Sequence, residues 1–178
     1  YINSLQVLCK DVIRVGSLSA GGKEICIDEQ YKPKPPCLVY SFGMKTKSFR
    51  KADQIWFYNW GLGGENTRNE LGWQIKTVDI DIEGDEWYSI PQMISSGALD
   101  DVKQISMETH FISKTPGGQL WGSHPIPPAD ELYTLRLLYD EGFRICMRER
   151  NLYSKMTWPG FNNSITNVNK LSLIKSMK

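Results

Sequence analysis

Short apolar runs, bounded by glycine, proline and charged residues, predict that much of this chain forms β-strands. Residues 1–36 predict an N-terminal extension, a short helix followed by a hairpin-like element, which a proline-rich connector joins to the rest of the chain. The strands predicted beyond this extension are Cys37–Ser41, Gln54–Asn59, Thr77–Ile82, Lys103–His110, Phe143–Met147 and Val168–Ile174.

Two helices are predicted between these strands. The first has Ser89 as its N-cap and ends at Gly97, and the second begins after Pro125 and ends at Gly142. Strands that alternate with helices predict an α/β fold. Because the last two strands are joined without a helix, the C-terminal strand is predicted to form an antiparallel edge on a mainly parallel sheet.

Length and charge exclude several classes of protein. The 178 residues correspond to a single domain of ordinary globular composition, and the net charge of +1 argues against a nucleic-acid-binding platform. No apolar run is long enough to cross a bilayer, so we expect no membrane span within this chain. The composition does not indicate an oligomeric state.

The four cysteines say little on their own. They stand at positions 9, 26, 37 and 146 without a C-x-x-C pair, which argues against a zinc site and leaves both disulfides and buried thiols open. One glycosylation triplet begins at Asn162. The triplet and the cysteines are both compatible with a protein of the secretory pathway.

The residues that follow the predicted strands are the candidates for chemistry, because ligands of α/β sheets bind at the carboxyl ends of the strands. Ser41, Phe42 and Gly43 close the first buried strand, and the glycine there allows the backbone to approach a ligand closely. A tight turn is the simpler interpretation. The three residues belong to neither a dinucleotide-binding motif nor a phosphate-binding loop.

Paired polar side chains end two further strands. Asp81 and Glu83 alternate onto one side of their strand, where two carboxylates can bind a cation, accept hydrogen bonds or act as a base; a solvated acidic loop is the alternative. Glu108 and His110 share a side in the same way, so a carboxylate is predicted beside an imidazole. For a single histidine such as His110, a structural role is the simpler interpretation.

Five motifs occur in order along most of the chain, at Cys37–Gly43, Asn59–Gly63, Asp81–Trp87, Val102–Phe111 and Gly142–Ile145. Together they resemble the S-adenosylmethionine-dependent methyltransferases of the methyltransferase-like 24 group, relatives of the FkbM-type sugar O-methyltransferases. The chain is most similar to invertebrate members that O-methylate hexoses on glycans. The resemblance implies a Rossmann-like methyltransferase sheet, a glycan acceptor and a place in the Golgi lumen.

The resemblance also implies roles for individual residues. The donor, S-adenosylmethionine, is expected to contact Ser41, Phe42, Gly43, Asn59, Trp60 and Gly61. His110 is the first candidate for the base that takes the proton of the sugar hydroxyl, and Glu83 and Asp81 are the second. Alternatively, the carboxylates hold a divalent metal that acidifies the hydroxyl.

Two junctions depart from the family pattern. Near 49/50 the family has a helix and an acidic strand end that binds the donor ribose, and near 80/81 it has a helix and the start of a strand. We interpret both junctions as missing segments, an interpretation that an intact mass of 20.4 kDa would contradict. If the chain is continuous there, a non-catalytic binding module is the alternative function. A further alternative is a methyltransferase that acts on a small molecule or a protein, which would share the donor site and differ only in the acceptor.

Overall fold

The computed structural model describes residues 5–15, 22–32, 38–43, 55–58, 75–110, 128–151, 154–157, 164–166 and 168–176, with the backbone alone at 38–43, 55–58, 75–76, 128–129, 155–157 and 164–165. These residues contain ten strands and two helices. The strands are β1 (Val12–Val15), β2 (Lys23–Cys26), β3 (Leu38–Gly43), β4 (Ile55–Tyr58), β5 (Ile75–Asp81), β6 (Gln104–His110), β7 (Phe143–Arg150), β8 (Lys155–Thr157), β9 (Ser164–Thr166) and β10 (Val168–Lys175). The helices are α1 (Glu86–Ser95) and α2 (Pro128–Asp140).

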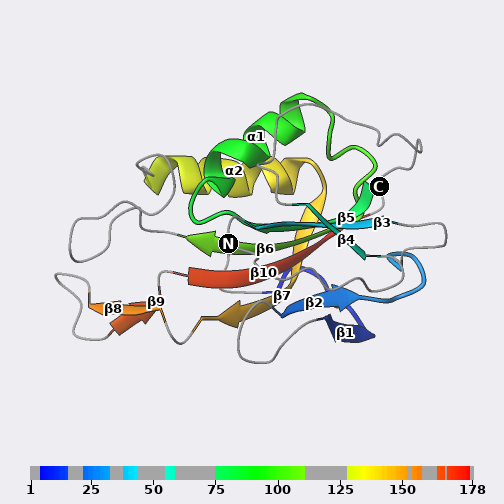
Figure 1. The fold of residues 1–178 in the computed structure, drawn as a ribbon, viewed down its shortest axis with the longest axis horizontal. Coiled ribbons are helices and arrows are strands. Elements are labelled where there is room, and N and C mark those ends of the chain that lie inside the picture. The colour runs from blue at the N-terminus through cyan, green and yellow to red at the C-terminus, as the bar shows by residue number, and fades with distance from the viewer. Residues whose placement is uncertain are drawn as a thin grey trace.

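Six strands form one mixed sheet, in the order β4-β3-β5-β6-β10-β7 (Figure 1). The first four strands are parallel, and β10 runs antiparallel to both of its neighbours. Gly43 lies opposite Asp81 and Ile80 lies opposite Met107, so β3, β5 and β6 end at the same side of the sheet. We call this side, marked by Gly43, Asp81 and His110, the carboxyl edge.

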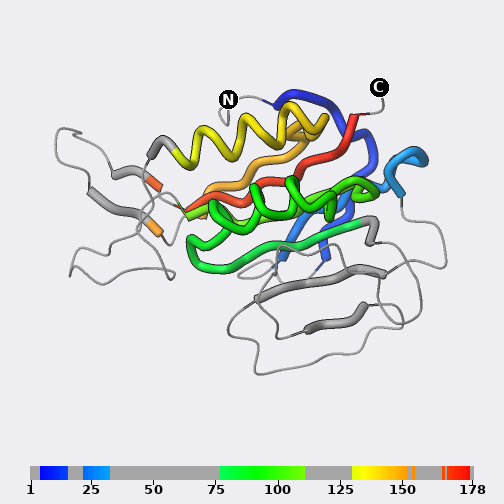
Figure 2. Tube along the Cα trace, turned by 90° about the horizontal axis from the view of Figure 1, so that it is seen from above, coloured from blue at the N-terminus to red at the C-terminus, as the bar shows by residue number. Residues whose placement is uncertain are grey.

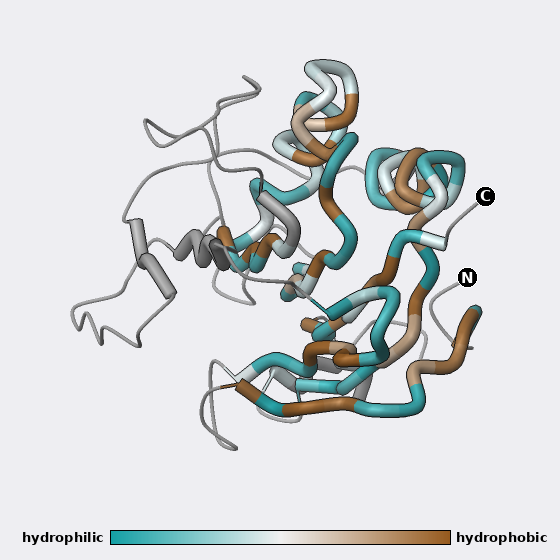
Figure 3. Tube along the Cα trace, turned by 90° about the vertical axis from the view of Figure 1, so that its right-hand side faces the viewer, coloured by the Kyte–Doolittle hydropathy of each residue, from teal (hydrophilic) through white to brown (hydrophobic). Residues whose placement is uncertain are grey.

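Both helices cover one face of the sheet, side by side (Figures 1 and 2). The apolar side chains of β5 and β6 alternate with polar ones, and Val78, Ile80, Ile105 and Met107 pack against α1. Figure 3, which looks along the strands, shows hydrophobic and hydrophilic residues interspersed along the described parts of the chain. The core on the helix side is therefore built from every second residue of the central strands.

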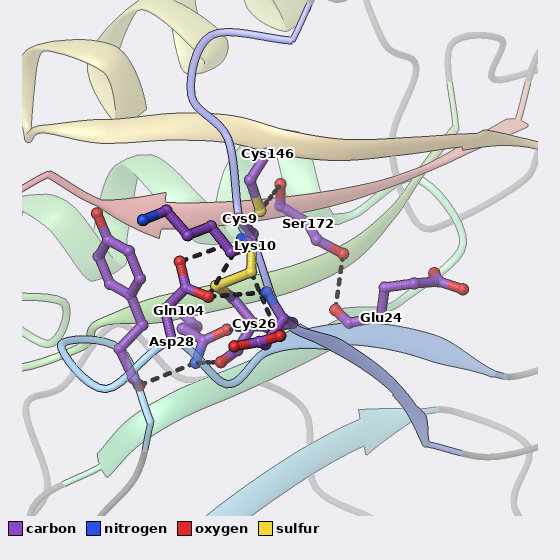
Figure 4. Close-up of a disulfide and its surroundings, with 10 residues drawn as sticks. Cys9, Lys10, Glu24, Cys26, Asp28, Gln104, Cys146 and Ser172 are labelled. Carbon is purple, nitrogen blue, oxygen red and sulfur yellow. Dashed lines mark hydrogen bonds between the residues drawn. A yellow bond between two sulfur atoms is a disulfide. The ribbon is translucent and has the colours of Figure 1, made fainter.

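The opposite face is covered by the antiparallel hairpin β1–β2 instead of helices (Figure 1). The Gln104 side chain accepts a hydrogen bond from the Cys26 N–H (3.0 Å) and donates to the carbonyl oxygens of Cys26 (2.7 Å) and Tyr31 (3.0 Å). The Ser172 hydroxyl donates to the Glu24 carbonyl (2.9 Å), and a disulfide joins Cys9 to Cys26 (Figure 4). Polar side chains of the sheet thus hold the hairpin in place.

The expectation of a Rossmann-like methyltransferase sheet is wrong. Among the described residues there are two helices against ten strands, and four of the seven strand pairings are antiparallel. The physical reason is the polar face of β5, where Thr77, Asp79 and Asp81 alternate with apolar residues. A sheet with helices on both faces needs strands that are apolar on both sides, and this one offers an apolar surface on one side only.

Several smaller expectations can be compared with the structure. The hairpin in the N-terminal extension is confirmed, but residues 5–11 form no helix. The C-terminal strand β10 is antiparallel to its neighbours, as predicted. It was expected at the edge of the sheet, but it lies between β6 and β7, and β7 is the edge strand. The first helix begins at Glu86 rather than after Ser89, because the turn at Glu83 and Gly84 already starts it.

The interpretation that segments are missing near 49/50 and 80/81 stays a prediction, and a measurement of the intact mass of the chain tests it. In the structure β5 runs through the 80/81 junction as one strand, and the 49/50 junction lies outside the described residues. Neither of the two described helices has the length and apolar character that a membrane crossing requires.

We predict that the Cys9–Cys26 disulfide stabilises the hairpin against the sheet. Replacing both cysteines with serine should lower the free energy of unfolding by about 3 kcal/mol, because a cross-link across a loop of this length restricts the unfolded chain. Urea denaturation measures this change. The Cys146→Ala variant, which loses a buried free thiol and keeps the disulfide, is the matched control. An equal loss of stability in both variants would contradict the prediction.

Candidate functional site

The turn between β5 and α1 brings acidic residues to the carboxyl edge. Glu83 has a positive φ of 58° and Gly84 one of 107°. A left-handed backbone is uncommon for a residue other than glycine, and such conformations cluster at functional sites. The Gly84 N–H donates a hydrogen bond to the Glu86 side chain (2.8 Å), which fixes the turn and starts the helix.

Glu86 and His110 form a buried pair at the end of β6. The Glu86 carboxylate is fully buried; its Oε1 accepts a hydrogen bond from the His110 backbone N–H (2.7 Å) and lies 2.9 Å from His110 Nδ1. The Trp87 indole N–H donates to the His110 carbonyl (2.7 Å). We assign the ring proton to Nδ1, because the carboxylate there accepts it. The imidazole is therefore held in one orientation, with Nε2 3.8 Å from a Glu83 oxygen.

The charges around His110 favour its protonated form. Burial by itself lowers the pKa of the imidazole, but the hydrogen bond and charge of Glu86, together with Asp81 and Glu83, outweigh burial and raise the pKa. Carboxylates that raise the pKa make the deprotonated imidazole a stronger base, so general-base catalysis by His110 requires a pH above this raised pKa.

A second group of side chains lies next to this pair. Asp81, Glu108 and His110 each offer one ligand atom, and the three atoms lie within 4.8 Å of one another. Burial and the nearby Asp81 charge raise the pKa of Glu108, while Lys23 lowers it, and Asn151 donates a hydrogen bond to Glu108 (3.1 Å). These three residues can hold a divalent cation.

Lys23 reaches the same group from the hairpin. Its side chain is 5% exposed, and its Nζ lies 3.7 Å from Asp81 Oδ2 and 3.9 Å from Asp79 Oδ1. Among the described residues, no hydrogen-bond partner lies within reach of this Nζ. Sequence reasoning missed Lys23, because nothing in a local pattern shows which residue of a distant hairpin covers Asp79 and Asp81.

Glu131 is the second site residue that sequence reasoning missed. It lies in the first turn of α2, it is 8% exposed, and its Oε1 has no hydrogen-bond partner in the part of the chain that the structure describes. Burial, together with the nearby Glu86 charge, raises the pKa of Glu131 to about 8. The side chain therefore carries a proton at neutral pH. An acidic residue on the inner side of an amphipathic helix was the available signal.

The structure brings the three catalytic candidates together. Asp81, Glu83 and His110 all lie at the carboxyl edge, as the strand ends predicted. The carboxylate bonded to the imidazole is Glu86, however, and the expected Glu108 instead lies beside Asp81. Glu86 lies at the N-terminus of helix α1. Alternation along a single strand predicts only neighbours on that strand, so it could not predict this contact.

The donor candidates are only partly described. Ser41, Phe42 and Gly43 end β3, and the strand register puts Gly43 opposite Asp81. Asn59, Trp60 and Gly61 lie outside the described residues. A cavity of about 440 Å³ opens at the other side of the sheet, next to Tyr31, Lys103 and Gly142, and contains no predicted site residue.

A comparison with protein-family models, with curated proteins and with solved structures found no match. The function is therefore argued from the geometry of the carboxyl edge.

We predict that Glu131 makes the stability of the protein depend on pH. Because its pKa rises from 4.5 to about 8 on folding, the folded protein keeps a proton that the unfolded chain releases. Stability should therefore fall between about pH 4.5 and pH 8, by an amount on the order of 3 kcal/mol. Glu131→Gln cannot ionise, so it should match the native protein at pH 5 and exceed it at pH 8.5.

Urea denaturation at both pH values tests this expectation. Asp130→Asn is the matched control, since it removes the same formal charge from the same helical turn. If Glu131→Gln and the native protein lose stability in parallel as the pH rises, Glu131 is not the group responsible.

Proposed function

We propose that the protein transfers a methyl group from S-adenosylmethionine to a hydroxyl of a sugar in a glycan. The observation that carries the proposal is the His110 imidazole, which Glu86 orients at the carboxyl edge with Nε2 near Glu83. The proposal rests on these side chains rather than on the fold, because one chemistry occurs on many unrelated folds.

The position of Gly43 supports a donor site beside the acceptor site. Gly43 ends β3 and lies opposite Asp81, so it is the neighbour of the strand end that leads to Glu83. Glycine lets a ligand approach the backbone closely. Parallel strands commonly bind ligands where they end, and β3 and β5 end together here.

Methyl transfer is an in-line displacement with a simple balance of bonds. The S–CH₃ bond breaks while the O–CH₃ bond forms, and the electron pair of the broken bond stays on sulfur, which becomes a neutral thioether. The hydroxyl proton passes to a base at the carboxyl edge. His110 Nε2 and Glu83, 3.8 Å apart, are the groups in place to receive it. Alignment of the two substrates supplies the remaining catalysis.

The proposed acceptor fits a location in the Golgi lumen, where glycans are modified. The Cys9–Cys26 disulfide supports this location, because disulfides form and persist in oxidising compartments. A non-catalytic binding module remains the alternative outcome of the experiments below.

The first experiment incubates a panel of glycans with isotopically labelled donor. We predict transfer of label to a glycan, and a loss of turnover of roughly 10²–10⁴-fold in His110→Ala with donor affinity retained. The control is Ile105→Val on the same strand, which should cost only about 1 kcal/mol of stability and keep its turnover. A His110→Ala variant that melts earlier but keeps the turnover of its folded fraction would show a structural role for His110.

The second experiment tests the donor site by calorimetry with S-adenosylhomocysteine. We predict that Gly43→Val abolishes binding and leaves the far-ultraviolet circular dichroism intact, because the new side chain occupies space that the donor needs. Unchanged affinity in Gly43→Val would reject the assignment of Gly43. Absence of heat with the native protein would instead favour a binding module without donor affinity.

A further inference from the structure

The inner side of α2 changes its character along the helix. Leu135 and Leu138, in the second half, pack with the hydrophobic core. Glu131 and Thr134, in the first half, lie on the same side of the helix and are buried although both are polar. Apolar contacts therefore hold the second half of α2 on the sheet, whereas the first half depends on polar ones.

One polar contact joins the first half of α2 to the start of α1. The two helices lie side by side over the sheet (Figure 2), and the Thr134 hydroxyl donates a hydrogen bond to the Trp87 carbonyl (3.2 Å). Trp87 directly follows Glu86, and its indole N–H donates to the His110 carbonyl. The first half of α2 is thus attached to the segment that orients His110.

Glu131 makes no such contact. Its side chain is buried, and its Oε1 has no hydrogen-bond partner in the described part of the chain. An ionised carboxylate is stable in a protein interior only when an opposite charge or hydrogen bonds compensate it. Glu131 therefore has two favourable states: it carries a proton and stays buried, or it ionises and moves into water.

Glu86 on α1 makes an ionised Glu131 less favourable still. The Glu86 carboxylate is fully buried, where it accepts hydrogen bonds from the Gly84 and His110 backbone N–H groups. Burial and, after it, the negative charge of Glu86 raise the pKa of Glu131 to about 8. Above that pH, a docked α2 would hold two negative charges near each other in the interior.

Among the described residues, no positive charge lowers the pKa of Glu131. On β7, which also packs against α2, Arg148 donates to the Asn169 side chain (3.2 Å). Arg144 of the same strand bonds the Tyr139 carbonyl, about 12 Å further along the helix than Glu131. The other charged residues of α2 are Asp130, Arg136 and Asp140, and the last two pair with each other.

We propose that the first turn of α2 is a pH-dependent clamp on the start of α1, docked while Glu131 carries a proton and released when Glu131 ionises. Leu135 and Leu138 keep the second half of the helix in place, so residues 128–134 move without it. Release breaks the hydrogen bond between Thr134 and Trp87 and loosens the segment that orients His110. The clamp is independent of the proposed methyl transfer.

Hydrogen exchange followed by NMR, without donor or acceptor, tests the clamp. The amide hydrogens of residues 132–135 bond to carbonyls of the first turn, so their protection reports whether this turn is docked. Between about pH 6 and pH 8.5, their protection relative to the unfolded chain should fall by roughly tenfold to a hundredfold, because only the docked turn retains the Glu131 proton. The amide hydrogens of residues 138–140 should keep their protection.

Three variants separate the role of Glu131 from that of its neighbours. Glu131→Gln keeps the size of the side chain and cannot ionise, so its first turn should be equally protected at both pH values. Asp130→Asn is the matched control: it removes a carboxylate from the same turn and should retain the full pH-dependent loss. Thr134→Val lacks the hydrogen bond to Trp87 and should lower protection by a similar factor at both pH values.

Three results would overturn the inference. Equal loss of protection in residues 132–135 and 138–140 would show that the whole helix opens. Unchanged protection of the first turn would show that an ionised Glu131 finds a partner and stays docked. Both results come from the native protein, so they decide the question even if a variant fails to fold. The same pH-dependent loss in Glu131→Gln would assign the change to another group.

Discussion

The fully buried carboxylate of Glu86 joins the start of α1 to the end of β6, and the arrangement of the site depends on it. It accepts hydrogen bonds from the Gly84 and His110 backbone N–H groups and orients the His110 ring. A buried carboxylate without partners costs several kcal/mol, so each of these contacts compensates part of the cost of burying Glu86. The turn, the helix start and the imidazole are consequently positioned as one unit.

The two faces of the sheet differ because polar and apolar residues alternate from Thr77 to Asp81 in β5 and from Gln104 to Glu108 in β6. Their apolar residues pack against the helices. On the other face, Gln104 of β6 bonds to the hairpin, and Lys23 of the hairpin pairs with Asp81 of β5. Polar residues in a buried layer need partners at defined positions, unlike apolar ones. The hairpin supplies these partners, and the disulfide at Cys26 ties it to the N-terminal segment. This polar layer ends at the carboxyl edge, so the same charges serve packing and chemistry.

The proposed activity depends on the orientation that Glu86 gives to the His110 ring. Because the Glu86 carboxylate is bonded at Nδ1, the other ring nitrogen, Nε2, lies 3.8 Å from a Glu83 oxygen. Methyl transfer requires the acceptor hydroxyl to bind near this nitrogen. Glu83 lies in the turn after β5, where its φ is positive.

The sequence by itself determined the local elements and the ends of the strands that carry chemistry. Alternation placed β5 and β6 and identified Asp81 and His110, because a strand's side chains follow from its own residues. Glu83 was expected on the same strand as Asp81, but β5 ends at Asp81 and Glu83 lies in the turn that follows, with a positive φ. Only the tertiary structure decided the partners: Glu86 for His110, Lys23 for Asp79 and Asp81, and the hairpin for the second face. Those contacts join segments far apart in the chain. Each contact forms because one segment compensates a charge that is buried on another segment. The periodicity within a single segment does not show which distant segment will do so.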